Sequence, residues 1–420
     1  MAVARPSSER SVVTRRLTGT VFVTVAFGMV AFYAALTAAP LVAVELTGTE
    51  RWSGVPGAAG LVGIATASAV LAEVMARRGR RAGLVLGWTT GAVGAAGAVA
   101  AIAVGWFPLL LLAMLAIGWG HSANLLARYA AADASPVARR ASMLSLVVWA
   151  GTIGAMVGPS LLGPGASVAA WFDLPDLTGG YLAAIVATSV AATLCAVRLR
   201  PDPSQLVGGT ASTERRAVGA QDTTAPARGV RLRDGRQRLL AITALVTAQF
   251  VMVLIMTVTP VHVRVRGHDH SLGDVGVVLS LHFLGMFGLA PIIGRVADRR
   301  GPLPVVLVGL SLVAVPGVVA ATVPPTSVGA LATALLLLGL GWSAAFVASS
   351  AMLADAGASL QGRVDSAGWA VAALASVGSG LLLQAAGHAV LSLIGAGLAV
   401  VPIVWVIRTL RGSGPVSRPA

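Results

Sequence analysis

Long apolar runs, separated by short polar or Gly/Pro segments, occupy most of the 420-residue sequence. An α-helix needs about 20 predominantly apolar residues to cross roughly 30 Å of hydrocarbon, and the runs meet that length. No long stretch alternates apolar and polar residues as the strands of a membrane barrel do. The pattern therefore predicts about twelve transmembrane helices, over residues 18–46, 53–76, 83–105, 107–131, 142–166, 179–198, 239–262, 272–297, 303–324, 326–353, 364–387 and 388–409. The least distinct break is the one at Gly387-His388.

Residues 199–238 form the one long polar stretch, and they separate six predicted helices from six more. Pro201, Pro203 and a run of arginines are typical of a flexible linker whose basic second half lies along a membrane surface. We therefore expect an N-terminal six-helix bundle over residues 1–198, a cytoplasmic basic linker over 199–238 and a C-terminal six-helix bundle over 239–420.

The two halves of the chain resemble each other at a nearly constant offset. Residues 72–81 match residues 294–303 in register, at an offset of 222 positions. The same offset relates Asp133 to Asp355. Matches at several positions favour a duplicated unit over coincidence. The expected fold class is an all-α membrane protein with twelve transmembrane helices in two pseudo-symmetric six-helix bundles.

Composition and charge support a membrane location. Hydrophobic residues make up 56% of the chain and charged residues 11%, whereas soluble domains carry about 25% charged residues. The net charge of +14 comes from arginine, and only Arg51, Arg264 and Arg266 fall on the side opposite the N-terminus. This positive-inside pattern predicts a multi-pass protein of the cell (inner) membrane with both termini in the cytoplasm. It also argues for anionic lipid headgroups and against nucleic acid as a partner.

The loop after the eighth predicted helix carries a motif. Gly294, Asp298, Arg299 and Gly301 match the pattern Gly-x-x-x-Asp-Arg-x-Gly, which is the cytoplasmic loop signature of the major facilitator superfamily. With the span count, the linker and the repeat, the motif makes the whole chain resemble that family. The resemblance implies the major facilitator fold, transport by alternating access, and a gating role for this loop.

The first-half copy of the loop departs from the signature. Ala72 stands where the pattern has glycine, and Ala76 stands where it has aspartate. Glu73 precedes Arg77 by four residues, a spacing that predicts a local ion pair on a helix. Arginines that only set the topology are the alternative to a gate. The gating candidates that this copy retains are Arg77, Gly79, Arg80 and Arg81.

The fifth predicted helix contains Gly154, Gly158 and Pro159. The run is similar to the glycine–proline motif of drug/proton antiporters in the same superfamily, and this resemblance implies export. Pro159 lacks a backbone N–H, so we expect a kink. We expect the glycines to let the helix pack closely on the opposite half. A kink that serves packing alone is the alternative.

Few polar residues lie at bilayer depth, where they are costly and usually functional. His121, Asn124 and Arg128 form one stripe along the fourth helix, which we expect to face a central cavity. His282 lies near the middle of the eighth helix. Since histidine changes charge near neutral pH, we expect His121 or His282 to bind the coupling proton or the substrate. Neutral histidines satisfied by their neighbours are the alternative.

Aromatic residues supply further candidates for substrate binding. Trp119 and Trp342 lie at similar depths of the fourth and tenth helices, which line the cavity in the family. Aromatic faces stack on planar or cationic compounds, and Gln249 in the seventh helix offers a polar contact. Core packing is the alternative for each tryptophan.

No motif points to catalysis, a cofactor or a metal. Cys195 is the only cysteine, and the chain has neither a phosphate-binding loop nor a His-Glu-x-x-His motif. We therefore expect a monomeric secondary transporter that uses protons to export a small, partly apolar compound such as a drug or metabolite. The alternatives are proton-coupled uptake of a nutrient or vitamin and, more distantly, an intramembrane enzyme or a lipid-handling protein.

Overall fold

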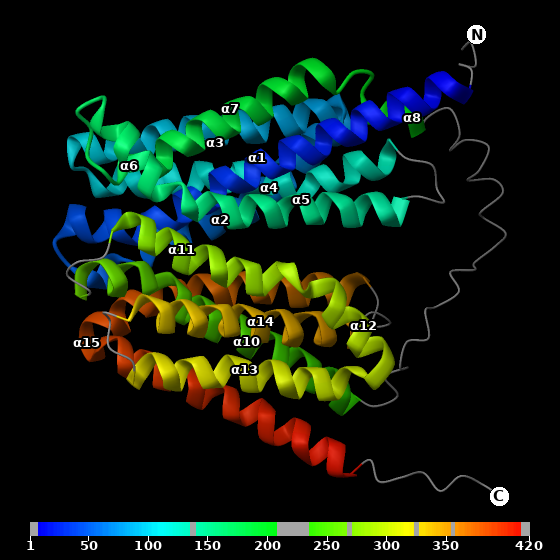
Figure 1. Cartoon of the computed structure of the whole chain (residues 1–420). Coiled ribbons are helices and arrows are strands. Elements are labelled where there is room, and N and C mark those ends of the chain that lie inside the picture. The colour runs from blue at the N-terminus through cyan, green and yellow to red at the C-terminus, as the bar shows by residue number, and fades with distance from the viewer. Residues whose placement is uncertain are drawn as a thin grey trace, which may run out of the picture. The chain divides into compact units, whose positions relative to one another are not determined.

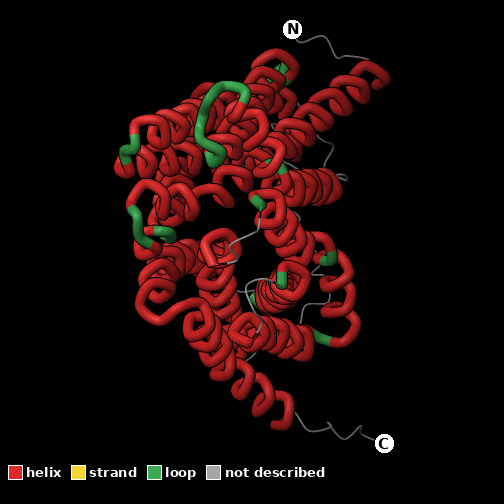
Figure 2. Tube along the Cα trace, turned by 60° about the vertical axis from the view of Figure 1, so that its left-hand side comes forward, coloured by secondary structure: helices red, strands yellow, loops and turns green. Residues whose placement is uncertain are grey.

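The part of the chain that the structure describes is built from helices. The computed structural model describes residues 7–134, 140–207, 235–266, 271–322, 327–353 and 358–412, and every regular element in these ranges is a helix (Figure 1). Figure 2 shows the same helical composition along the chain trace. The chain divides into two compact units, the first comprising residues 1–38 and 59–225 and the second residues 39–58 and 226–420. The all-α fold predicted from the sequence is confirmed.

The helices of the first half follow the predicted spans, except that the span predicted as one helix over residues 142–166 is two helices that meet at Leu161. Their bounds are α1 Ser7–Thr47, α2 Val55–Arg78, α3 Arg80–Val104, α4 Phe107–Asp133, α5 Arg140–Ser160, α6 Leu162–Ala170, α7 Thr178–Arg198 and the short α8 Pro203–Val207. The end of α1, the 3-10 turn η1 (Glu50–Trp52) and the start of α2 belong to the second unit.

The second half repeats this arrangement with more interruptions. Its elements are α10 Gly235–Val261, η3 His262–Arg266, α11 Leu272–Phe283, η4 Leu284–Gly288, α12 Ala290–Arg300, α13 Pro302–Thr322, α14 Val328–Met352 and α15 Ala358–Gly412. The elements η3 and η4 are π-helical turns, which hold an extra residue per turn. The span predicted as one helix over residues 272–297 is therefore three pieces. Pro291, which has no N–H to donate, lies at the start of the last piece.

The number of membrane-spanning helices agrees with the prediction. Ten helices in the described ranges are long and apolar enough to cross a membrane, and the bent pair α5–α6 adds an eleventh. One of the ten, Ser366–Leu410, contains Gly387, whose φ of 79° interrupts the helix. Glycine adopts a positive φ at little cost because it has no Cβ. The break predicted at Gly387-His388 is confirmed, and it supplies the twelfth span.

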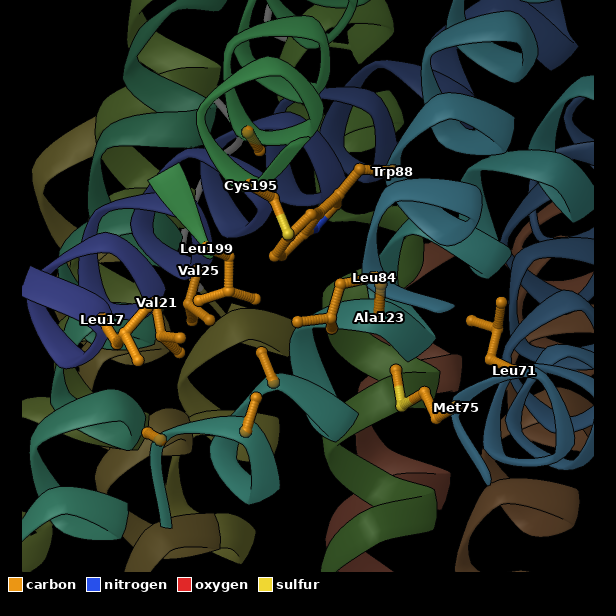
Figure 3. Close-up of a cluster of buried hydrophobic side chains, with 14 of the residues drawn as sticks. Leu17, Val21, Val25, Leu71, Met75, Leu84, Trp88, Ala123, Cys195 and Leu199 are labelled. Atoms are coloured by element: carbon orange, nitrogen blue, oxygen red, sulfur yellow. The ribbon is translucent and has the colours of Figure 1, made fainter. Parts of the chain in front are cut away.

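The first unit has a core of small and branched side chains. Leu17 and Val21 of α1 are buried against residues of α2, α3, α4 and α7. Figure 3 shows Trp88 of α3 and Cys195 of α7 pointing toward one another within this cluster. Small residues let α3 and α4 approach closely, since a Cβ added at Gly91 would lie 3.1 Å from the Cα of Gly120.

Residues 39–58 come from the first half of the sequence but pack within the second unit. The backbone N–H of Arg51 donates to Oε1 of Gln384 in α15 at 2.8 Å, and the Thr49 hydroxyl contacts the same oxygen. A Cβ added at Gly380 would lie 2.7 Å from the Arg51 carbonyl oxygen. The compact units thus differ from the two sequence halves at this segment. Most of the predicted linker, residues 208–234, lies outside the described residues.

Candidate functional site

The first unit holds His121 of α4 in an aromatic environment contributed by α1. The imidazole stacks on the ring of Phe32, with ring centroids 3.8 Å apart and an angle of 27° between the planes. Tyr33 meets the imidazole edge-on, at a centroid distance of 6.3 Å. His121 is only 4% exposed, and its Nδ1 has no hydrogen-bond partner among the described residues. The ring is therefore held by packing, while one nitrogen remains available to a proton or ligand.

Asn124 lies one turn after His121 and connects α4 with α3. The indole N–H of Trp88 donates to Oδ1 of Asn124 at 2.8 Å, which fixes the orientation of the amide. The amide nitrogen Nδ2 is buried without a hydrogen-bond partner among the described residues. Gly28 of α1 makes this placement possible, because a Cβ there would overlap Oδ1 of Asn124. The Trp88–Asn124 hydrogen bond was not anticipated from the sequence.

The polar side chains of α4 thus contact several other helices of the first unit. Ser122 and Ser68 of α2 lie within hydrogen-bonding distance of each other, at 2.9 Å between their hydroxyl oxygens. Trp119 packs partly buried against the hydrophobic core. Arg128, the third member of the predicted stripe, lies outside the residues whose side chains the structure describes.

In the second unit, Gln249 and Trp342 form a direct pair. The indole N–H of Trp342 in α14 donates to Oε1 of Gln249 in α10 at 2.7 Å. Phe346 stacks on Trp342 at a centroid distance of 4.8 Å and an interplanar angle of 19°. Phe287 of η4 approaches edge-on at 6.1 Å. The four side chains are half-buried, so they form an aromatic wall with one amide at its edge.

His282 is fully buried and makes a structural contact. Its Nδ1 lies 2.8 Å from the carbonyl oxygen of Leu335, and a carbonyl can only accept. Nδ1 therefore carries the hydrogen, which leaves Nε2 as an acceptor without a partner among the described residues. A Cβ at Gly339 of α14 would overlap the His282 carbonyl oxygen, so the two helices are in close contact here.

The two copies of the loop signature share one backbone feature. Gly79 has a φ of 90° and Gly301 a φ of 85°, and each directly precedes a helix. Only glycine adopts this φ readily. The repeat predicted from the 222-residue offset therefore has a counterpart in backbone conformation at the two glycines.

The side chains around the two loops differ. Arg77 and Glu73 form the predicted ion pair, on the surface of α2. Asp298 and Arg299 are exposed, and neither makes an ion pair within the described residues. Gly294 has open space around it, so the structure gives no packing reason for glycine at that position.

Arg80 and Arg81 are engaged within the first unit. Arg80 forms an ion pair with Asp133 at the end of α4, with 2.8 Å between Nε and Oδ2. The guanidinium of Arg81 donates to the carbonyl of Ala196 in α7 at 3.2 Å. The backbone N–H groups of both arginines donate to Asp202. Sequence reasoning missed Asp202, because it lies about 120 residues away in a polar stretch.

The glycine–proline motif packs on α1 and lies close to a bend. A 51° bend separates α5 from α6 at Leu161, two residues after Pro159. Added Cβ atoms at Gly154 and Gly158 would collide with the backbone of α1 near Ala26 and Val30. The expectation that these glycines contact the opposite half is therefore wrong, since residues 1–38 belong to the same unit as α5. A bend is present, but it follows Pro159 by two residues, whereas a proline disrupts the turn that precedes it.

Nothing in the described ranges gathers three or more His, Cys, Asp or Glu side chains into a set that could hold a metal ion. The chemistry available to the candidate residues is consequently proton binding, hydrogen bonding and ring stacking. These are the interactions with which a site recognises and releases a small molecule.

Comparisons with known proteins extend over most of the chain. A sequence profile of the Major Facilitator Superfamily matches residues 21–380. The uncharacterized MFS-type transporter YdeG of Bacillus subtilis (strain 168) is 32% identical over 409 residues, which cover 96% of this chain and 94% of the relative. The riboflavin transporter RfnT of Brucella anthropi is 28% identical over 366 residues, covering 84% and 85% of the two chains.

A solved structure shares the same arrangement of helices. The E. coli xylose transporter XylE, in a partially occluded inward-open conformation, matches with a TM-score of 0.68 and 12% identity. The match covers 93% of this chain and 97% of that chain. At this level of identity the likeness concerns the fold alone.

Proposed function

Because the chain belongs to the major facilitator superfamily, we propose that it exports a small, partly apolar compound in exchange for protons by alternating access. Family membership makes it a multi-pass membrane transporter and not an enzyme. The proposal further includes the cell (inner) membrane as location, cytoplasmic termini and a monomeric state. It also includes two six-helix bundles, residues 1–198 and 239–420, joined by a cytoplasmic linker at 199–238.

The contact between Gln249 and Trp342 is the observation that supports the chemistry of the substrate. An amide in the middle of a membrane-spanning helix avoids lipid, so Gln249 and the adjoining rings are expected to face protein or a water-filled cavity. Trp342, Phe346 and Phe287 are only half-buried and present ring surface there. Flat, partly apolar molecules stack on such rings. Oε1 of Gln249 is taken by Trp342, so its NH2 group is the part that would donate to a ligand.

His121 is the proposed site of the coupling proton. Its Nδ1 is buried and has no hydrogen-bond partner among the described residues. Phe32 stacks face to face on the imidazole, and the negative face of an aromatic ring stabilises a cation above it. Tyr33 is the titratable group that faces the ring from α1. His282, whose Nδ1 already donates to a backbone carbonyl, is the weaker candidate.

Export as the direction rests on the resemblance of Gly154, Gly158 and Pro159 to the motif of drug/proton antiporters. Uptake is the second candidate function, because the relative RfnT is named as a riboflavin transporter. Riboflavin is itself a flat heteroaromatic compound with polar groups, so the aromatic wall around Trp342 suits either direction of transport.

Everted membrane vesicles from overexpressing cells separate the two directions. With the lumen made acidic, an exporter that exchanges substrate for protons accumulates ethidium or riboflavin inside the vesicles. We expect accumulation of at least one of these flat probes, and we expect a protonophore to abolish it. Vesicles without the protein serve as the control.

Intact cells test for uptake, the opposite direction of transport. Overexpression that raises the riboflavin content of intact cells, together with no accumulation in everted vesicles, would replace export with uptake. A Trp369→Ala variant is a matched control for any Trp342 variant, because Trp369 of α15 is 37% exposed and takes no part in the Gln249–Trp342 hydrogen bond.

A further inference from the structure

The first copy of the loop signature lacks its aspartate, yet a carboxylate from a distant segment occupies the helix end beside it. The helix α3 begins at Arg80. The backbone N–H groups of Arg80 and Arg81 donate to Oδ1 and Oδ2 of Asp202, at 3.1 and 2.9 Å. The first N–H groups of a helix lack intrahelical acceptors and carry the positive end of its dipole. Asp202 therefore satisfies two of them with an anion.

Ser204 also holds the carboxylate of Asp202 in this position, and Gly79 leaves room for it. The backbone N–H and the hydroxyl of Ser204 donate to Oδ1 at 3.0 and 2.7 Å. Gly79 has a φ of 90°, and a Cβ added there would lie 2.5 Å from Oδ2 of Asp202. The signature glycine of the first loop thus serves the turn and also leaves room for this carboxylate.

The contacts spread from Asp202 to several helices of the first unit. Arg80 pairs with Asp133 at the end of α4, and Arg81 donates to the carbonyl of Ala196 in α7. Two residues before Asp202, the carbonyl of Arg200 accepts a hydrogen bond from the guanidinium of Arg16 in α1. One end of α1, α3, α4 and α7 is thereby joined through a few residues at the start of the polar stretch.

The second copy of the loop has no equivalent arrangement within the described residues. Asp298 is exposed and has no ion-pair partner there. A Cβ added at Gly301 would meet nothing within 4 Å, whereas one at Gly79 would meet Asp202. The two loops share a backbone conformation but differ in what surrounds their glycines.

We propose that Asp202 is a positioning residue that clamps the arginine-rich end of the first unit by capping α3. The contacts of the first loop hold its own unit together. The loop therefore does not need the aspartate of the signature, and alanine can stand at position 76. The second loop keeps its acidic residue exposed and available for a partner. This assignment does not depend on the substrate or on the direction of transport.

The native cysteine allows the proposal to be tested without introducing another labelling site. Cys195 is the only cysteine of the chain, is 1% exposed and directly precedes Ala196. Alkylation of Cys195 by N-ethylmaleimide, measured by mass on the purified full chain in detergent, reports opening of this end of the unit. Amide hydrogen exchange at Arg80 and Arg81 reports the helix cap directly. Both measurements are made well below the unfolding temperature.

The variants Asp202→Ala and Asp202→Asn are compared with Asp298→Asn. We expect Asp202→Ala to raise the alkylation rate and the exchange at Arg80 and Arg81 by about tenfold or more, with a smaller rise for Asp202→Asn. Asp298→Asn should change neither rate. If Asp202→Ala fails to fold, the milder Asp202→Asn carries the test. Exchange at Arg80 and Arg81 that stays at the wild-type rate, or that rises equally in Asp298→Asn, overturns the proposal.

Discussion

The hydroxyl of Ser376 donates a 2.7 Å hydrogen bond to the backbone carbonyl of Gly54, which lies 322 positions earlier in the chain. A Cβ added at Gly54 would overlap the carbonyl oxygen of Ser376. The two backbones therefore approach this closely only because residue 54 is glycine. Thr49 and Arg51 contact Gln384 two turns further along α15. These contacts explain why residues 39–58 belong to the second unit.

We predict that Gly54→Ala separates residues 39–58 from α15. A backbone carbonyl cannot move aside as a flexible side chain does, so the added methyl group has to displace the segment. Cysteines introduced at Thr49 and Gln384, with Cys195 replaced by serine, measure the contact through disulfide formation under a mild oxidant. Disulfide formation should be efficient in the parent and at least about fivefold slower in Gly54→Ala.

Gly60→Ala is the matched control for this measurement. Gly60 lies in α2, six residues after Gly54, and an added Cβ there would meet its nearest atoms at 3.6 Å, which is ordinary van der Waals contact. Its cross-linking rate should equal that of the parent. Equal rates for Gly54→Ala and Gly60→Ala would mean that the Gly54–Ser376 approach does not hold the segment.

A second glycine prediction concerns the environment of Asn124. We predict that Gly28→Ala destabilises the protein by about 1–3 kcal/mol, because the added Cβ overlaps Oδ1 of Asn124 in a packed interior. Displacing the amide also deprives the buried indole N–H of Trp88 of its acceptor. Thermal unfolding of the purified protein, followed with a thiol-reactive dye at Cys195, gives the shift in Tm.

Gly19→Ala on the same helix separates packing from helix propensity. No atom lies within 4 Å of a Cβ added at Gly19, so this variant should have an unchanged or higher Tm. A loss of Tm as large in Gly19→Ala as in Gly28→Ala would show that the contact with Asn124 is not the cause.

The sequence carries the information for spans and breaks because lipid imposes a requirement that each helix meets alone. The break at Gly387 and the paired turns at Gly79 and Gly301 follow from local apolar length and from the freedom of glycine to adopt a positive φ. Hydropathy along one helix therefore locates its ends without knowledge of any partner.

Contacts between helices do not follow from such local patterns. Gly154 and Gly158 signal a close approach, but their spacing does not say which helix approaches, and the partner is α1 of the same unit. Asp202 caps a helix that begins about 120 residues earlier in the chain. The residues next to Asp202 in the sequence predict only a polar stretch, and they give no sign of this contact. The pairing of Gln249 with Trp342 likewise depends on how α10 and α14 pack.

His121 and His282 are predicted to behave differently when replaced. His121→Gln should lower proton-driven accumulation of the flat probe at least about tenfold and remove its dependence on the pH gradient, since the proposed proton site is lost. Counterflow of substrate, which needs no net proton movement, should persist. Both are measured in everted vesicles, over a range of lumenal pH.

His282→Gln serves as the contrasting variant. The hydrogen bond from Nδ1 to the Leu335 carbonyl holds α11 against α14, so we expect a lower Tm and less protein in the membrane. The transport that remains should keep its pH dependence. The assignment of the proton site would be reversed if transport became independent of pH in His282→Gln and kept its normal pH dependence in His121→Gln.

The last prediction concerns the aromatic wall. Trp342→Leu removes the stacking surface shared with Phe346 and leaves Oε1 of Gln249 without its donor, so the apparent KM for a flat probe should rise about tenfold. Trp342→Phe keeps an aromatic face but has no N–H, and a rise of about threefold or less is expected. Ring stacking on a ligand contributes roughly 1 kcal/mol or somewhat more, which corresponds to effects of this size. Initial transport rates over a range of ethidium or riboflavin concentrations measure both values, with Trp369→Ala as the control. Equal KM values for Trp342→Leu and Trp369→Ala would remove Trp342 from the substrate site, because only one of the two tryptophans adjoins Gln249.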